Sequence, residues 1–278
     1  MENQEKKKRN NHIQSNADYI ANEKTKRSKG KFLITFIRII SIIVILICIG
    51  ALIYRYFNLK SSKKLIDEIS SDITIDHKNI TVDQATAELI DTDILSLKRK
   101  NSDTVAFLKV GGTNISYPVV KASDNDFYLK HSFDKSYSQS GWIFMDYRND
   151  LNLKDKNTII YGHNMLNDTM FSELNKMLKN SFFDSEENRY INLSLENKST
   201  LWKIFSVYIS EPDTYYLSTN FSNNNTYLEF LNNLKNKSAF DLKEDVTNQN
   251  KILTLSTCTN LNTKRLVVHA KLVYEENK

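Results

Sequence analysis

The longest apolar run of the chain lies near its N-terminus. Sixteen uncharged residues, 39–54, separate Arg38 from Arg55, and most of them are Ile, Leu or Val. Extended back to Phe32, the run is long enough as a helix to cross a bilayer core of about 30 Å at about 1.5 Å per residue. The pattern therefore predicts one transmembrane helix over residues 32–57. A cleaved signal peptide is the alternative, but no small-residue cleavage site follows the run.

The pattern that follows, over residues 58–100, predicts helices. Residues 58–71 are polar except for three apolar side chains at helical spacing, which indicates a stalk helix: Leu65, Ile66 and Ile69. The sequence Thr81-Val-Asp-Gln84 fits a capping box at the start of a second helix that runs to about Lys98. Its inner face would consist of Ala85, Leu89 and Ile90.

From Thr104 onward the pattern changes to short runs of β-branched and aromatic residues. Eight such runs are present, at 104–110, 114–120, 141–146, 157–161, 189–195, 200–209, 251–257 and 265–274. Short strands of this number, separated by polar turns, predict a mainly β domain that forms a barrel or a sandwich.

Two stretches between these strands have helical periodicity. One apolar stripe with i, i+3, i+4, i+7 spacing consists of Phe171, Leu174, Met177 and Leu178. The second, within the long connection 211–250, consists of Tyr227, Phe230, Leu231 and Leu234. Both stripes predict helical insertions whose apolar faces pack on the core.

The excess of positive charge lies in residues 1–57, which carry eleven Lys or Arg against four Asp or Glu. Residues 1–31 carry nine Lys or Arg against four Asp or Glu, and this bias predicts a cytoplasmic N-terminus with the β domain outside. Residues 58–278 carry 27 positive and 29 negative side chains, a net charge of −2. A domain with this balance lacks the basic surface expected of a nucleic-acid-binding protein.

Candidate chemistry centres on the second of two cysteines. Cys48 lies in the apolar run and Cys258 outside it, so no disulfide is expected. Cys258 ends the apolar strand 251–257, His163 ends the strand that begins near Asn157, and Arg265 begins the last strand. The spacing of His, Cys and carboxylate residues does not fit a metal site, so no metal is expected.

Six motifs in this order make the chain resemble class B sortases, from about Ser96 to its C-terminal end. They are Tyr117-Pro-Val-Val, Asp124-Asn-Asp-Phe-Tyr-Leu, Gly141-Trp-Ile-Phe-Met-Asp-Tyr-Arg148, Tyr161-Gly-His-Asn-Met165, Met170-Phe171 and Thr254-Leu-Ser-Thr-Cys258. The resemblance implies an eight-stranded sortase-type β-barrel with N-terminal helices and two helical insertions, preceded by the transmembrane helix. It also implies that the connection 211–250 helps to wall the substrate groove.

The same resemblance implies catalytic roles for His163, Cys258 and Arg265. Acyl transfer from a peptide needs a nucleophile, a proton donor for the leaving amine and a group that stabilises the oxyanion. The Cys258 thiolate would attack, His163 would carry the proton, and Arg265 would hold the substrate carbonyl. Six residues, 259–264, are enough for a hairpin connection that brings Cys258 and Arg265 together.

Three further residues are candidates for binding the substrate peptide. Ser256 and Thr257 match the positions before the nucleophile, and strand alternation places Ser256 on the same side as Cys258. Tyr161 alternates in the same way with His163 and is a candidate for lining the groove. A core position for Tyr161 is the alternative, because tyrosines in such strands commonly pack inside.

The function implied is that of a membrane-anchored cysteine transpeptidase that uses no cofactor. It would cleave a C-terminal Pro-x-Thr-type sorting motif of surface proteins after Thr, and transfer the acyl group to an amine of a peptidoglycan precursor. The implied organisation is a cytoplasmic tail (1–31), a transmembrane helix (32–57), helices (58–100) and an extracellular catalytic barrel (101–278).

Three other functions remain as alternatives. A papain-like or amidase-type cysteine hydrolase would place its Cys before its His and at a helix N-terminus, whereas His163 precedes Cys258 by 95 residues here. A non-catalytic surface module would not need Cys258, His163 and Arg265 together. A sortase that polymerises pili is compatible with the same motifs.

Overall fold

The computed structural model describes residues 2–71, 73–165, 167–211, 214–258 and 264–278. For residues 2–13, 16–17, 27–33, 55, 58–59, 61–63 and 258 it describes the backbone only. The chain forms two compact units, Met1–Phe57 and Asn58–Lys278.

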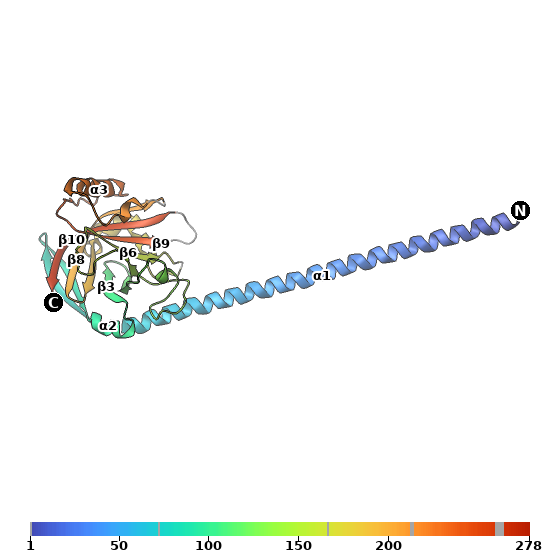
Figure 1. Cartoon of the computed structure of the whole chain (residues 1–278), viewed down its shortest axis with the longest axis horizontal. Helices are drawn as coiled ribbons and strands as arrows, with labels where there is room; N and C mark the ends of the chain where they lie inside the picture. Colours follow the sequence, from blue (N-terminus) through green and yellow to red (C-terminus); the bar gives the residue numbers. More distant parts are fainter. Residues whose placement is uncertain (1, 72, 166, 212–213, 259–263) are drawn as a thin grey trace. The chain divides into compact units, whose positions relative to one another are not determined.

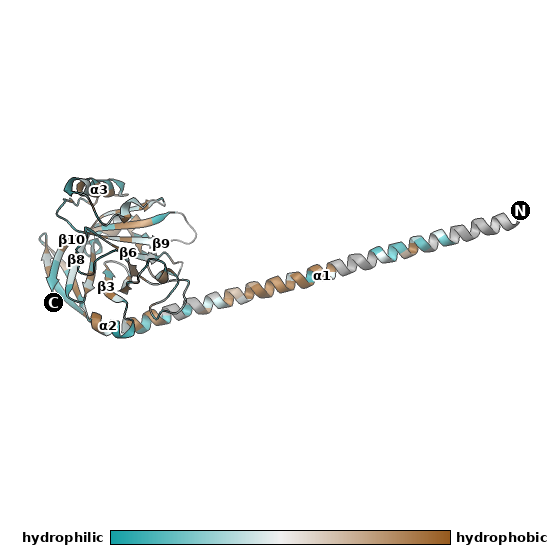
Figure 2. Cartoon of the chain, viewed as in Figure 1, coloured by the Kyte–Doolittle hydropathy of each residue, from teal (hydrophilic) through white to brown (hydrophobic). Residues whose placement is uncertain are grey.

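The N-terminal helix α1 (Glu2–Ser71) contains the apolar run. Its stretch Ile34–Tyr54 is long and apolar enough to cross a membrane by length and composition, and Figure 2 shows it as a brown segment. The large apolar side chains of this stretch are exposed, as expected for a helix that would be surrounded by lipid. The candidate span thus lies within the predicted range 32–57.

The end of α1 belongs to the second unit. Ile69 is buried in the main core there, and Leu65 and Ile66 are partly buried against the same core. Helix α1 thus includes the predicted stalk helix 58–71, and its three apolar side chains lie against the core.

The prediction of a helix from Thr81 is wrong. Strands β1 (Ile75–Val82) and β2 (Ala85–Thr92) form an antiparallel hairpin instead. Asp83 and Gln84 adopt positive φ angles of 49° and 68°, which suits a two-residue hairpin turn and not the first turn of a helix. The helix in this region is shorter: α2 (Ile94–Lys100) follows Asp93, whose side chain accepts a hydrogen bond from the Ser96 amide at 3.0 Å.

Tertiary packing explains why the hairpin forms in place of that helix. Alternate residues of its two strands pack on the outer surface of the barrel and make a small cluster: Ile80, Val82, Ala87, Leu89, Tyr190 and Leu201. Alternation along a strand provides this one-sided apolar face as well as a helical stripe would.

In the described part of the chain, eight strands close into a barrel, so the sandwich alternative is excluded (Figure 1). They are β3 (Thr104–Val110), β4 (Ser116–Val120), β5 (Phe144–Met145), β6 (Asn157–His163), β7 (Tyr190–Leu195), β8 (Lys198–Ser210), β9 (Ile252–Cys258) and β10 (Arg265–Asn277). Around the barrel the order is β10-β8-β7-β3-β4-β5-β6-β9. Each strand falls on a predicted run, although β5 has only two paired residues.

The two insertions differ in helix type. The first consists of 3₁₀ segments, Ser172–Leu178, Asn180–Asp184 and Glu186–Arg189, so the i, i+4 stripe marked buried positions but not an α-helix. The second is the α-helix α3 (Asn224–Lys237), which Asn223 caps through a capping box with Thr226. Its apolar face packs on the outside of β8, β9 and β10.

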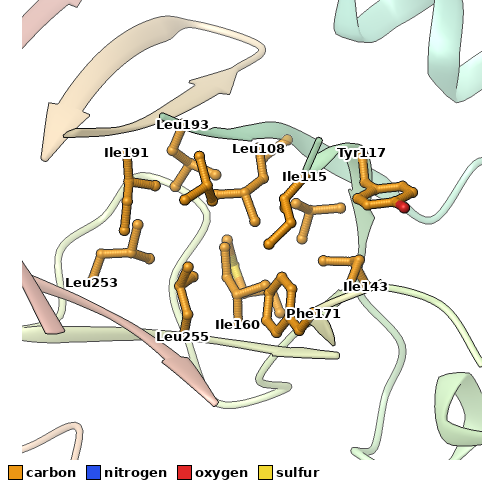
Figure 3. Close-up of a cluster of buried hydrophobic side chains, with 14 of the residues drawn as sticks. Leu108, Ile115, Tyr117, Ile143, Ile160, Phe171, Ile191, Leu193, Leu253 and Leu255 are labelled. Carbon is orange, nitrogen blue, oxygen red and sulfur yellow. The ribbon is translucent and has the colours of Figure 1, made fainter. Parts of the chain in front are cut away.

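The barrel interior is apolar and fully enclosed. Figure 3 shows apolar side chains from the strands and from the segments between them meeting there: Leu108, Ile115, Ile143, Ile160, Phe171, Ile191, Leu193, Leu253 and Leu255. On β9, Leu253 and Leu255 point into this core, so Thr254 and Ser256 belong to the outer face. Those two residues are nevertheless fully buried, because the connection between β8 and β9 covers them.

Candidate active site

Two parallel strands bring the predicted histidine and cysteine to the same end of the barrel. Strand β6 ends at His163 and its neighbour β9 ends at Cys258, and these two residues are direct partners in the register. Both segments form strands because β-branched, aromatic and other apolar residues predominate in them. The side chain of Cys258 lies outside the described residues, so its position is known through the backbone of β9.

Arg265 joins this end of the barrel from the other side of β9. It begins β10, which pairs antiparallel with β9, as predicted for strands joined by a short connection. The Arg265 Nη1 donates to the carbonyl oxygen of Thr257 at 3.4 Å, next to Cys258. Residues 259–263 of the predicted hairpin connection lie outside the described residues.

The imidazole of His163 is buried and oriented by a backbone carbonyl. Its Nε2 lies 2.8 Å from the oxygen of Leu129, which can only accept, so Nε2 carries a proton. Gly141 permits this approach: it adopts φ +55°, and a Cβ there would lie 2.5 Å from the oxygen of Tyr128 and 2.8 Å from that of Leu129. A larger residue at this position would therefore displace the carbonyl that holds His163.

The three predicted peptide-binding residues all have partners within the protein. The Ser256 hydroxyl lies 3.0 Å from the hydroxyl of Tyr216, and the Thr257 hydroxyl accepts from the Leu266 amide at 2.9 Å. Tyr161 donates to Asp146 at 2.8 Å. Ser256 and Thr257 are fully buried and Tyr161 is nearly so, and all three lie within two residues of His163 or Cys258 on their strands.

Asp146 is a fully buried carboxylate beside these residues. It accepts two bonds from the Arg148 guanidinium, at 2.9 and 2.8 Å, and one from Tyr161. Burial alone would raise the pKa of Asp146, but the hydrogen bonds from Arg148 and Tyr161 outweigh it and hold the pKa below its ordinary value. Burial and the charge of Asp146 raise the pKa of Tyr161 well above 10, so both groups keep one protonation state at neutral pH.

A second buried chain of hydrogen bonds crosses the outer face of the same strands. Thr254 donates to the Asn157 oxygen at 2.7 Å, so its hydroxyl accepts from His269 Nδ1 at 2.9 Å. The other ring nitrogen, Nε2, then accepts from Tyr208 at 3.1 Å. Burial, with a smaller effect of Lys237, lowers the pKa of His269 to about 3, so this histidine is neutral and structural.

Sequence reasoning missed the residues that support the candidate site. Asp146, Arg148, Gly141 and Leu129 all lie in motifs that carry the family resemblance, yet no function was predicted for them. One signal was available in the sequence: an Asp and an Arg lie two residues apart directly after a buried strand. A charged side chain at the edge of the core needs a partner of opposite charge, so these two residues could have been expected to pair. The carbonyl of Leu129 leaves no signal in a sequence, because every residue has one.

Comparison with known proteins identifies the family of this arrangement. The sortase domain family matches residues 108–273. Sortase B of Listeria monocytogenes is 33% identical over 217 residues, which span 77% of this chain and 86% of that protein.

Two solved structures are similar as well. The Staphylococcus aureus sortase B–substrate complex has a TM-score of 0.61 and 37% identity, over 65% of this chain and 84% of that one. A sortase B complexed with triglycine has a TM-score of 0.62 and 37% identity, over 64% and 84% of the two chains. The chain therefore belongs to the sortase family of cysteine transpeptidases, and its relatives group it with class B.

Proposed function

We propose that this transpeptidase cleaves surface proteins at a C-terminal Pro-x-Thr-type motif and joins the threonine to a cell-wall amine. The observation that carries the proposal is the register of β6 and β9, which pairs His163 with Cys258 while Arg265 reaches the carbonyl beside Cys258. The substrate and triglycine complexes of similar sortase B structures support a peptide substrate and an amine acceptor.

In the proposed reaction the Cys258 thiolate attacks the carbonyl carbon of the motif threonine. The carbonyl oxygen becomes an oxyanion, which the Arg265 guanidinium stabilises. The C–N bond then breaks, His163 gives its proton to the departing amine, and a thioester between Cys258 and the substrate remains. The acceptor amine attacks that thioester, His163 takes up its proton, and the C–S bond breaks to release the new amide.

His163 is suited to this proton transfer by its orientation. The hydrogen bond from Nε2 to the Leu129 carbonyl oxygen fixes the orientation of the imidazole ring. Nδ1 is then the nitrogen that exchanges the proton in the proposed reaction. We propose that Tyr161, Ser256 and Thr257 contribute to the peptide-binding site by supporting its surface.

The proposed cellular arrangement follows from the charge distribution. Residues 1–31 would remain in the cytoplasm, residues 32–57 would cross the membrane, and residues 58–278 would face the cell wall. Within the outer part, residues 58–100 would support the catalytic barrel of residues 101–278. Protease added to wall-stripped cells should degrade the barrel and spare a tag placed before Met1, whereas protection of the barrel would reverse this topology.

The reaction is tested with the full-length protein in detergent, labelled Asn-Pro-x-Thr and Ser-Pro-x-Thr peptides, and two acceptors. Triglycine represents a wall-type amine, and a peptide with a lysine side chain represents the acceptor of a pilus-polymerising enzyme. Mass spectrometry should detect an amide to triglycine, whereas hydrolysis alone would favour a peptidase. Cys258→Ala should abolish turnover and the matched Cys48→Ala variant should retain it; turnover by Cys258→Ala would refute the assignment.

The role of Arg265 has its own test. Loss of one oxyanion donor costs about 100- to 1000-fold in turnover, so Arg265→Ala should lose activity on this scale. Arg265→Lys should recover only part of it, because it keeps the charge but loses the planar two-pronged geometry. Lys264→Ala removes the exposed charge next to it and should change kcat/KM little. An Arg265→Ala variant within a few-fold of the parent would remove Arg265 from the site.

A further inference from the structure

The buried carboxylate of Asp146 collects five hydrogen-bond donors. They are the Arg148 amide, Nε and Nη2, the Asn125 Nδ2 and the Tyr161 hydroxyl, all at 2.8 to 3.1 Å. Its side chain has no exposed surface, whereas the partner side chain of Arg148 is 39% exposed. A charge in this position is stable only while its donors remain in place.

These donors connect parts of the chain that are distant in sequence. Asn125 comes from the segment between β4 and β5, where its oxygen also accepts from the Tyr147 amide, and Tyr161 comes from β6. The Arg148 Nη2 also donates to the carbonyl oxygen of Leu217 at 3.1 Å. The carboxylate thereby reaches the 3₁₀ turn Tyr215–Leu217 in the connection between β8 and α3.

The turn Tyr215–Leu217 is also attached directly to the two central strands. The Asn157 side chain of β6 donates to the Tyr216 carbonyl at 3.0 Å, and the Tyr216 hydroxyl bonds to Ser256 of β9. Tyr161 and Ser256 are register partners, and they precede His163 and Cys258 by two residues. The Asp146 network therefore ends two residues before the candidate catalytic pair on the same two strands.

We propose that Asp146 is a positioning residue for the substrate peptide. Through Arg148 and Tyr161, its carboxylate holds the turn Tyr215–Leu217 at a fixed position relative to the ends of β6 and β9. The inference rests on the proposed function, in which the peptide lies along this surface. Without the charge on Asp146, the half-exposed Arg148 can turn to water and release the Leu217 carbonyl, so the turn loses one of its attachments.

The main test is Asp146→Asn in the full-length protein, because asparagine keeps the size and removes the charge. We expect KM for the sorting peptide to rise about tenfold, the effect of one lost charge-assisted hydrogen bond, with kcat within about threefold. Amide exchange in the turn, measured by mass spectrometry after deuteration, should become at least about tenfold faster, because the turn opens more often.

A further measurement separates positioning from general damage. In a Cys48→Ala background, iodoacetamide should alkylate Cys258 in the Asp146→Asn variant within about twofold of the parent rate, because this reaction does not need the peptide surface. Arg148→Gln, which alters a more exposed residue, should reproduce the rise in KM if Asp146→Asn folds poorly. The double variant should be no worse than the single ones, since both act through one contact.

A matched control is the ion pair between Lys203 and Glu244, which is also largely buried and lies at 2.9 Å. Glu244→Gln should lower stability but leave KM and exchange in the turn unchanged. The proposal would be overturned if Asp146→Asn left either KM or amide exchange in the turn unchanged. It would also be overturned if alkylation of Cys258 slowed in proportion to the loss of stability, because the damage would then be general. If the parent protein cleaves no sorting peptide, the proposed function is wrong. If the parent cleaves the peptide and Asp146→Asn has the same KM as the parent, only the role of Asp146 is wrong.

Discussion

The inner and outer faces of β6 and β9 are both buried, but residues 160–161 and 254–256 give the two faces opposite kinds of side chain. Ile160 and Leu255 point inward into the apolar core. Tyr161, Thr254 and Ser256 belong to the outer face, and each of their hydroxyls has a hydrogen-bond partner in the protein. The two faces of the same strands therefore contribute different properties to the enzyme.

The difference lies in how strictly each interaction depends on position. Apolar contacts are non-directional, so the inner face stabilises the barrel without defining the position of each neighbour to a fraction of an ångström. Hydrogen bonds weaken steeply with distance and angle, and a buried polar group without a partner costs about 1–3 kcal/mol. The outer face therefore holds β10 and the turn Tyr215–Leu217 in one arrangement, close to where His163 and Cys258 end their strands.

The largest expected effect on stability comes from truncating an apolar side chain of the inner face. Leu255→Ala removes a fully buried side chain and should lower the free energy of unfolding by about 2–5 kcal/mol. Urea denaturation of the parent and variant measures this. Leu95→Ala is the matched control, because Leu95 is 54% exposed on α2 and its loss should cost less than about 0.5 kcal/mol. Equal effects of the two changes would contradict the assignment of the inner face.

Adding a methyl group at a tightly packed position of the inner face should also destabilise the barrel. A Cβ on Gly162 would lie 2.4 Å from Ile143 Cδ1 and 2.8 Å from Phe171 Cγ, so Gly162→Ala should cost about 1–3 kcal/mol. Ile143→Val removes the nearer atom and should recover part of that loss in the double variant. If Gly162→Ala unfolds at the same urea concentration as the parent, the core is looser than the structure indicates.

The outer face should respond to pH where the inner face does not. Because the pKa of buried His269 is about 3, the folded protein stays unprotonated there at pH 5, while the unfolded chain gains a proton below about pH 6.5. This contribution to stability is thus complete above pH 6.5 and is lost as the pH falls towards 3. At pH 5 the stability lost relative to neutral pH amounts to about 2 kcal/mol.

The variant His269→Gln removes this titration. It should unfold more easily than the parent at pH 7, but it should lose about 2 kcal/mol less on going from pH 7 to pH 5. Urea unfolding at both pH values provides the comparison. The same loss in parent and variant would show that His269 takes up its proton in the folded state as well.

The smallest expected effect concerns a single pair on the outer face. Tyr216 and Ser256 share one hydrogen bond at 3.0 Å, and a double-mutant cycle of Tyr216→Phe and Ser256→Ala should give a coupling of about 0.5–1.5 kcal/mol. A cycle of Tyr216→Phe with Leu255→Ala should give almost none, because those residues lie on opposite faces. A coupling near zero for the first pair would mean that the two faces do not differ as described.

The sequence by itself determined the parts of this protein that depend on short-range periodicity. An uninterrupted apolar run predicted the candidate membrane helix, and alternating β-branched runs predicted all eight barrel strands. The positions of His163, Cys258 and Arg265 at strand ends followed from the same runs. A strand boundary is a local property of the chain, so it can be read without knowledge of the fold.

Only the tertiary structure decided which distant groups meet. The hairpin of residues 75–92 replaced the predicted helix because its apolar face packs on the barrel, and local signals for helix and strand were both present. Arg148, which binds Asp146, reaches Leu217 across 69 residues, and Leu129 and His163 meet across 34. Such contacts follow no period and one of them uses a backbone carbonyl, so they arise only when the barrel closes and brings its connections together.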